Sequence, residues 1–208
     1  MALSNRTELL ASIADWLNRS DLTAVIPDFI SLAEAEMKRR LRRATESTTI
    51  SISAGNINGP SDMAEPIHLR LSSGDPFLDG TLSVCTPEML TDVRQRTGYV
   101  AGRPTHYAFY DGQLQFAPTP DQTYSGILLY AQQLTPLTAG NITNAVLTEA
   151  PDLYLFGSLL QAAPYMEHDE RIAVWQAKFD KGIDQMNEMR AREEMGAGLK
   201  EARLSHVF

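Results

Sequence analysis

The chain has 208 residues, of which 43% are hydrophobic and 21% are charged, a composition typical of a globular protein that buries a core of its own. Its formal net charge of -8 argues against a protein whose role is to bind nucleic acid tightly, because such binding depends on Lys and Arg neutralising phosphates. Cys85 is the single cysteine, which excludes a disulfide within the chain and a multi-cysteine metal site.

The N-terminal segment lacks the basic start and apolar centre of a signal peptide, and nowhere do about eighteen apolar residues follow one another. We therefore expect neither a cleavable export signal nor a membrane span. The single cysteine suits assembly in a reducing compartment such as the bacterial cytoplasm.

Two amphipathic helices are predicted at the N-terminal end. The first covers residues 5–18, where Asn5 and Glu8 have the spacing of a capping box. Its apolar stripe consists of Leu9, Leu10, Ile13, Trp16 and Leu17. The second helix is predicted from about 27 to 43, with Pro27 in its first turn. Its apolar residues are Phe29, Ile30, Ala33, Met37 and Leu41.

From residue 47 the pattern changes to short β-branched runs that Gly, Pro, Asn and Asp interrupt, which is typical of strands and turns. Residues 105–116 predict a hairpin, because Asp111-Gly112 lies between two strand-like runs. Further strands are predicted near residues 67–71, 81–85 and 124–132, and a short helix at 87–96.

Helical periodicity returns after residue 147. Pro151 is placed to open a helix that is apolar on most sides, so we expect it to be central and buried. Pro164 should end or kink this helix. A last helix, roughly 169 to 194, has one apolar stripe. The stripe consists of Ile172, Trp175, Phe179, Ile183 and Met186.

The predicted fold class is thus α+β: a four-helix core of two N-terminal and two C-terminal helices, with a β-rich insertion between them and an extended C-terminal tail. The predicted parts are residues 1–46, 47–147, 148–195 and 196–208. The tail follows Gly196 and Gly198 and ends in the apolar pair Val207 and Phe208, where segments are commonly frayed unless a partner docks them.

The residues that could carry chemistry form no recognisable catalytic or metal-binding pattern. The histidines are scattered, and none has the spacing of a metal motif. They are His68, His106, His168 and His206. No phosphate-binding glycine motif occurs, and Cys85, Trp16 and Trp175 are interpreted as core residues. We therefore expect no cofactor, no metal and no enzymatic activity.

One basic run stands out in this acidic chain: Lys38, Arg39, Arg40, Arg42 and Arg43. Two interpretations remain open. Cations at a helix C-terminus offset the helix dipole and can pair with acidic residues of neighbouring subunits. The run could instead touch DNA, although the acidic total makes phosphate attraction a weak global force. We favour the first interpretation.

Several stretches, in this order, resemble the head-to-tail adaptor proteins of tailed phages, including the connector and tail tubular proteins of short-tailed phages. These stretches are residues 13–22, 26–34, 39–42, 102–107, 116–120 and 150–157. None of them is a catalytic signature, so their weight comes from their number and order along most of the chain.

This resemblance implies a structural protein of the virion neck, made in the cytoplasm of the host bacterium. It implies a homo-oligomeric, dodecameric ring between the portal protein and a tail or nozzle protein, with genomic DNA passing through its channel without sequence-specific binding. The portal-binding residues would be those of the tail: Leu199, Arg203, Leu204, Val207 and Phe208. The alternatives are a neck-associated cell-wall hydrolase, which needs two suitably spaced carboxylates, and a soluble DNA-binding protein.

Overall fold

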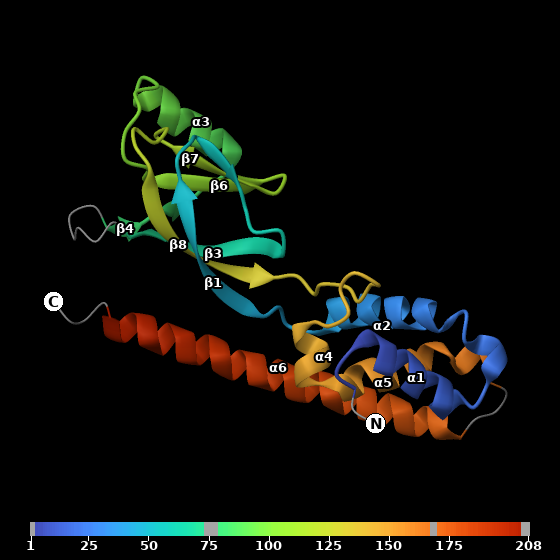
Figure 1. Ribbon diagram of the computed structural model, residues 1–208. Helices are drawn as coiled ribbons and strands as arrows, with labels where there is room; N and C mark the ends of the chain where they lie inside the picture. The colour runs from blue at the N-terminus through green and yellow to red at the C-terminus, as the bar shows by residue number, and fades with distance from the viewer. Residues whose placement is uncertain (1–2, 73–78, 167–169, 205–208) are drawn as a thin grey trace. The chain divides into compact units, whose positions relative to one another are not determined.

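A computed structural model describes residues 3–72, 79–166 and 170–204 of the chain. It divides into two compact units (Figure 1). The helical unit comprises Met1–Arg43 and Leu134–Phe208, and the β unit comprises Ala44–Gln133. The order of N-terminal helices, central strands and C-terminal helices confirms the predicted α+β fold class.

The four predicted helices of the helical unit begin close to where the sequence places them, and α4 was not predicted. The helices are α1 (Arg6–Leu17), α2 (Ile26–Arg40), α4 (Ala145–Glu149), α5 (Pro151–Gln161) and α6 (Arg171–Leu204), with 3-10 turns η1 (Ser20–Leu22) and η2 (Ala163–Tyr165). Pro151 opens α5 and Pro164 lies in η2 just beyond its end, as expected from their restricted backbones. Residues 134–147, which were predicted to belong to the insertion, belong to the helical unit.

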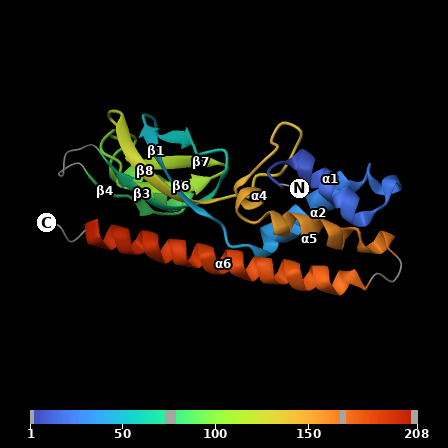
Figure 2. The ribbon, with the colours of Figure 1, turned by 60° about the horizontal axis from the view of Figure 1, so that its bottom comes forward.

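Helix α5 is the centre of the helical unit. It contacts α1, α2, α4 and α6, and Figure 2 shows it alongside α6. Leu153, Tyr154 and Leu159 are fully buried in the apolar core that these helices share. The prediction of a central, buried helix from Pro151 onward is therefore confirmed.

Two glycines allow α5 and α6 to approach closely. A Cβ atom at Gly157 of α5 would lie 2.9 Å from Cε2 of Phe179, and one at Gly182 of α6 would lie 2.7 Å from Cδ2 of Leu153. Real Cβ atoms do not come so near to neighbouring carbons, because interiors are already close-packed. The two side chains fill the space that the glycines leave open.

The N-terminal cap of α1 forms the first of the two hydrogen bonds that the capping-box spacing predicts. Asn5 Oδ1 accepts a hydrogen bond from the backbone N–H of Glu8 at 3.0 Å. The returning bond of the predicted capping box differs, because the Glu8 carboxylate accepts from the backbone N–H and the hydroxyl of Ser4, each at 2.8 Å. Position 5 is the cap, but Ser4 supplies the reciprocal donors.

Two expectations for the helical unit were wrong. Trp16 was interpreted as core, yet it is 42% exposed and meets Phe156 only at its edge. The last helix continues to Leu204, so residues 196–204 are helical and not an extended tail. Gly196 and Gly198 each weaken a helix by about 1 kcal/mol, which does not end a helix that has already passed six turns.

In its described part, the β unit forms two four-stranded sheets. The first has the order β1 (Thr45–Ile52), β8 (Tyr124–Gln132), β3 (Met63–Leu71) and β4 (Gly80–Thr81). The second has the order β2 (Asn56–Asn58), β7 (Gln113–Ala117), β6 (His106–Tyr110) and β5 (Ser83–Val84). Among the strands of residues 44–72 and 79–133, only β5 and β6 pair in parallel; the other neighbours are antiparallel.

Alternation along the strands gives the second sheet two different faces. Tyr107 and Phe116 turn toward the core that both sheets share, whereas Ala108 and Ala117 turn to the opposite face. Small residues on that face let α3 (Pro87–Arg96) pack closely through Leu90. Figure 1 shows α3 beside β6 and β7.

The predicted hairpin is confirmed. Asp111 and Gly112 separate β6 from β7, and both have positive φ, at 51° and 73°. A two-residue turn with this geometry matches the twist of the strands and favours Asp-Gly. The short helix at 87–96 is also confirmed at both ends.

Replacing Gly157 with alanine tests the close approach of α5 and α6. Overpacking against Phe179 should cost about 1–3 kcal/mol, against a gain of about 1 kcal/mol in helix propensity. We expect Gly157→Ala to lower the free energy of unfolding, measured by urea titration. Gly102→Ala is the control, because nothing lies within 4 Å of that Cβ position. An equal or smaller loss at position 157 than at position 102 would contradict the packing argument.

Candidate functional site

The basic run lies at the C-terminal end of α2. Lys38, Arg39 and Arg40 occupy the last turn of this helix, where positive charge offsets the negative end of the helix dipole. Arg42 and Arg43 follow in the segment that leads to the β unit, and both are exposed. Three residues of the run thus lie at the helix end, and two lie just beyond it.

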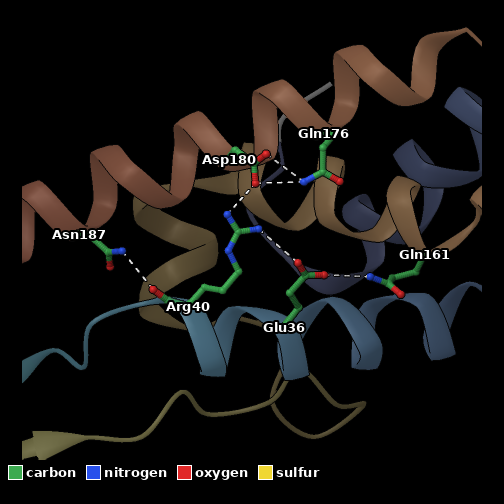
Figure 3. A network of polar contacts seen from close by, with 6 residues as sticks. All are labelled: Glu36, Arg40, Gln161, Gln176, Asp180 and Asn187. Carbon is green, nitrogen blue, oxygen red and sulfur yellow. Dashed lines mark hydrogen bonds and ion pairs between the residues drawn. The ribbon is translucent and has the colours of Figure 1, made fainter.

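The Arg40 side chain takes part in a network of hydrogen bonds and ion pairs within its own subunit (Figure 3). Its guanidinium donates to Asp180 of α6 at 2.6 Å and to Glu36 of α2 at 3.2 Å. The same group lies 5.3 Å from the centre of the Phe179 ring. Ion pairing with Asp180 raises the pKa of Arg40, so this residue is occupied inside the subunit.

The network joins three helices. Glu36 also accepts from Gln161 of α5 at 3.2 Å, and both Asp180 oxygens accept from Gln176 at 3.0 Å. Hydrogen bonds from Gln176 and then Arg40 lower the pKa of Asp180. Each ion pair is partly exposed and contributes little alone, so the network chiefly fixes the positions of α2, α5 and α6.

Side chains of α6 hold the backbone where α2 ends. Asn187 donates to the carbonyl of Arg40 at 3.1 Å and accepts from the backbone N–H of Arg42 at 2.7 Å. Arg190 donates to the carbonyl of Arg42. The Asn187 contact satisfies the carbonyl of Arg40, one of those that a helix C-terminus leaves without partners.

Arg190 is a charged residue in an unusual place, because only 7% of it is exposed. Burial lowers its pKa, while the charges of Glu149 and Glu193 oppose that change. A buried cation is costly unless charged or hydrogen-bonding groups compensate it. For Arg190 these groups include the carbonyl of Arg42. We call Arg40, Arg42, Asp180, Asn187 and Arg190 the α2–α6 junction.

A second anchor lies on α2. Glu34 is 5% exposed, and its Oε1 accepts from the backbone N–H of Leu137 at 2.7 Å and from the Tyr154 hydroxyl at 2.9 Å. Asn144 in turn donates to that hydroxyl at 2.6 Å. Burial raises the pKa of Glu34. This carboxylate therefore holds the chain as it returns from the β unit.

The sequence did not single out Glu34, although a signal was present. The residue follows Ala33 and lies between Ile30 and Met37, which are both buried. Those positions share the apolar face of α2, since residues three and four apart are neighbours on a helix. An acidic residue on such a face predicts a buried carboxylate with specific partners.

Cys85 does not have the surroundings of a catalytic thiol. Cys85 is partly buried against Leu90, its thiol donates to the Tyr107 carbonyl at 3.5 Å, and burial raises its pKa. A raised pKa makes a thiol a poor nucleophile. Among residues 3–72, 79–166 and 170–204, no three His, Cys, Asp or Glu side chains gather as metal ligands would.

None of the helices in the described part of the chain is both long enough and apolar enough to cross a bilayer.

The predicted portal-binding residues fall partly on α6. Leu199, Arg203 and Leu204 lie in its last turns, in a stretch whose side chains are not described. Val207 and Phe208 lie outside the described residues. In Figures 1 and 2, α6 continues past the other helices of its unit.

Comparison with known proteins gives a family. The family model described as SU10 adaptor protein matches residues 4–201, which is nearly the whole chain. It is a family of phage head-to-tail adaptors, so the resemblance found in the sequence is confirmed. The family is structural and not catalytic. No curated protein matches the chain.

The Glu34 anchor can be tested by removing its acceptor oxygens. Glu34→Ala leaves the Leu137 N–H and the Tyr154 hydroxyl without this acceptor, and each unsatisfied group costs about 1–3 kcal/mol. Glu34→Gln keeps an acceptor oxygen and should lose less free energy of unfolding. Equal losses for the two variants would count against the anchor.

The pH dependence of the free energy of unfolding gives a second test of the Glu34 anchor. Because burial raises the pKa of Glu34, the folded state binds this proton at a higher pH than the unfolded state does. Stability of the native chain relative to Glu34→Gln should therefore increase as pH falls from neutral through the folded pKa. Denaturant titrations at several pH values measure this difference.

Proposed function

Because the chain belongs to the SU10 adaptor protein family, we propose that it assembles as a ring below the portal of a tailed phage. The portal protein lies on one side of this ring and a tail or nozzle protein on the other. The single observation that carries the proposal is the match of residues 4–201 to a family of head-to-tail adaptors. A dodecamer matches the ring that the sequence resemblance implies.

The helical unit supports this proposal as the rigid body of the ring. Its α2–α6 junction ties α6 to the end of α2 through Arg40, Asn187 and Arg190. A subunit with fixed helices presents a constant surface to its neighbours, and less conformational freedom is then lost on association. Binding therefore needs no rearrangement of this unit.

Exposed apolar side chains of the helical unit supply candidate contact surface. Trp16, Leu32, Tyr165 and Val174 are between 42% and 57% exposed. Burying such groups between subunits is the main favourable term in assembly. We propose that neighbouring subunits cover several of them in the ring.

The acidic charge fits a channel through which DNA slides. With a formal net charge of -8, the chain repels phosphates at long range, so genomic DNA would pass without tight or sequence-specific binding. In the basic run we propose that Lys38, Arg39, Arg42 and Arg43 contribute to contacts between subunits. Arg40 donates to Glu36 and Asp180 of its own subunit.

The portal contact is proposed for the C-terminal segment: Leu199, Arg203, Leu204, Val207 and Phe208. A chain stopped after Gly196 keeps all the residues of α6 that are described as buried, the last of which is Arg190. We expect this truncation to fold, as judged by circular dichroism, and to lose the complex with purified portal in mass photometry.

The control for that truncation is a chain stopped after Leu204, which separates Val207 and Phe208 from the three residues on α6. Partial loss of the complex would assign part of the contact to the last four residues. A portal complex of unchanged mass after removal of residues 197–208 would contradict the proposed contact.

Charge reversal tests the role of the basic run. Arg39→Glu combined with Arg42→Glu should abolish rings by placing negative charge against acidic neighbours. Rings are counted by electron microscopy of the chain assembled on portals. Arg96→Glu, at the exposed end of α3, is the matched control and should assemble normally. Intact rings that fail to retain the genome would instead assign the run to DNA.

A further inference from the structure

Strand β1 lies at the outer side of its sheet. It pairs with β8 along its whole length, from Thr45 opposite Ala131 to Ile52 opposite Tyr124, without a shift in register. The sheet order gives it a neighbour on that side only. Its other side therefore presents backbone N–H and C=O groups that can pair with a further strand.

The residues that face outward follow from the antiparallel pattern. Gln132 donates to the carbonyl of Ala44 at 2.8 Å, so residue 44 belongs to a hydrogen-bonded pair with β8. Such pairs alternate with pairs whose backbone groups point the other way. The outward-facing residues are therefore Thr45, Ser47, Thr49 and Ser51.

The other outer strands are protected against pairing, and β1 is not. On the far side of β3, Pro66 lacks an N–H and β4 covers Arg70 and Leu71. Strand β3 is also irregular, because its register against β8 shifts twice. Strands β2 and β5 have only three and two residues. Strand β1 has eight residues without proline, lysine or bulge, although proteins usually carry such features on exposed edges.

We propose that β1 pairs with β1 of a second copy of this chain, antiparallel and about a two-fold axis at Thr48. Among the strands that the structure describes, no other outer strand offers an edge of matching length. The proposed register sets Thr45 against Ser51 of the second copy and Ser47 against its Thr49. Every outward-facing residue then has a backbone partner.

The side chains agree with this register. Glu46, the one charged residue of β1, lies opposite Ile50 of the second copy, so no like charges meet. Pairing centred on residue 46 would set the two Glu46 side chains directly against each other, which is unfavourable. Hydroxyl side chains face hydroxyl side chains at the outward positions.

A two-fold contact of this kind forms a dimer and cannot extend further, because each copy uses the same strand. It therefore concerns the free chain before it joins a portal, and it does not rest on the proposed ring. The two-fold pair would cover an edge that could otherwise take up unrelated strands.

The test uses the full chain in a Cys85→Ala background. Residue 48 would face itself across the axis in a non-hydrogen-bonded pair, where Cα atoms lie about 4.5 Å apart, within the range of a disulfide. The native chain should have the mass of a dimer in solution, and Thr48→Cys should crosslink on mild oxidation. Ser51→Cys is the control, because residue 51 faces position 45.

We expect Thr48→Cys to form covalent dimer at least about tenfold faster than Ser51→Cys, because disulfide geometry is narrow. Thr49→Pro should shift the native chain toward monomer while the β unit stays folded, since it removes an N–H that β8 does not use. A monomeric mass for the native chain, or equal crosslinking at positions 48 and 51, would overturn the proposal.

Discussion

Polar contacts of the helical unit fix the backbone at both ends of the insertion, and the architecture depends on these two sets of contacts. Asn187 and Arg190 of α6 bind the backbone that leaves α2, and Glu34 of α2 binds the backbone at Leu137. Buried polar groups of this kind are stabilising only when every partner is in place. The core between the helices sets their packing, whereas these polar contacts determine where the insertion starts and ends.

Periodicity and turn chemistry were enough to predict most elements. Strand β8, the Asp111-Gly112 hairpin, α3 and the start of α5 at Pro151 all follow from local signals. Strand β2 did not, because Asn56–Asn58 is polar and gains its conformation by pairing with β7. The length of α6 was missed since glycine lowers helix propensity without ending an established helix.

The location of the candidate site could be predicted from the sequence, but its contacts could not. The sequence locates the basic run at the end of a helix, as the structure has it. It could not show that Arg40 pairs with Asp180, because that contact joins segments far apart in the chain. Trp16 fits the helical stripe of α1 yet lies at its margin, where neighbouring helices leave it half exposed. The family, by contrast, was found from the order of short stretches and confirmed by the match over residues 4–201.

The division of the chain also sets an order of events during synthesis. The β unit is one continuous stretch, Ala44–Gln133, so the ribosome releases all of its strands before α5 exists. Helices α1 and α2 pack mainly against α5, which is synthesised after the β unit. A folded insertion brings the two halves of the helical core nearer than a loose loop would, which lowers the entropy lost on closing that core. The nascent N-terminal helices meanwhile keep their apolar stripes uncovered, and chaperones that bind such stripes would have their longest opportunity there.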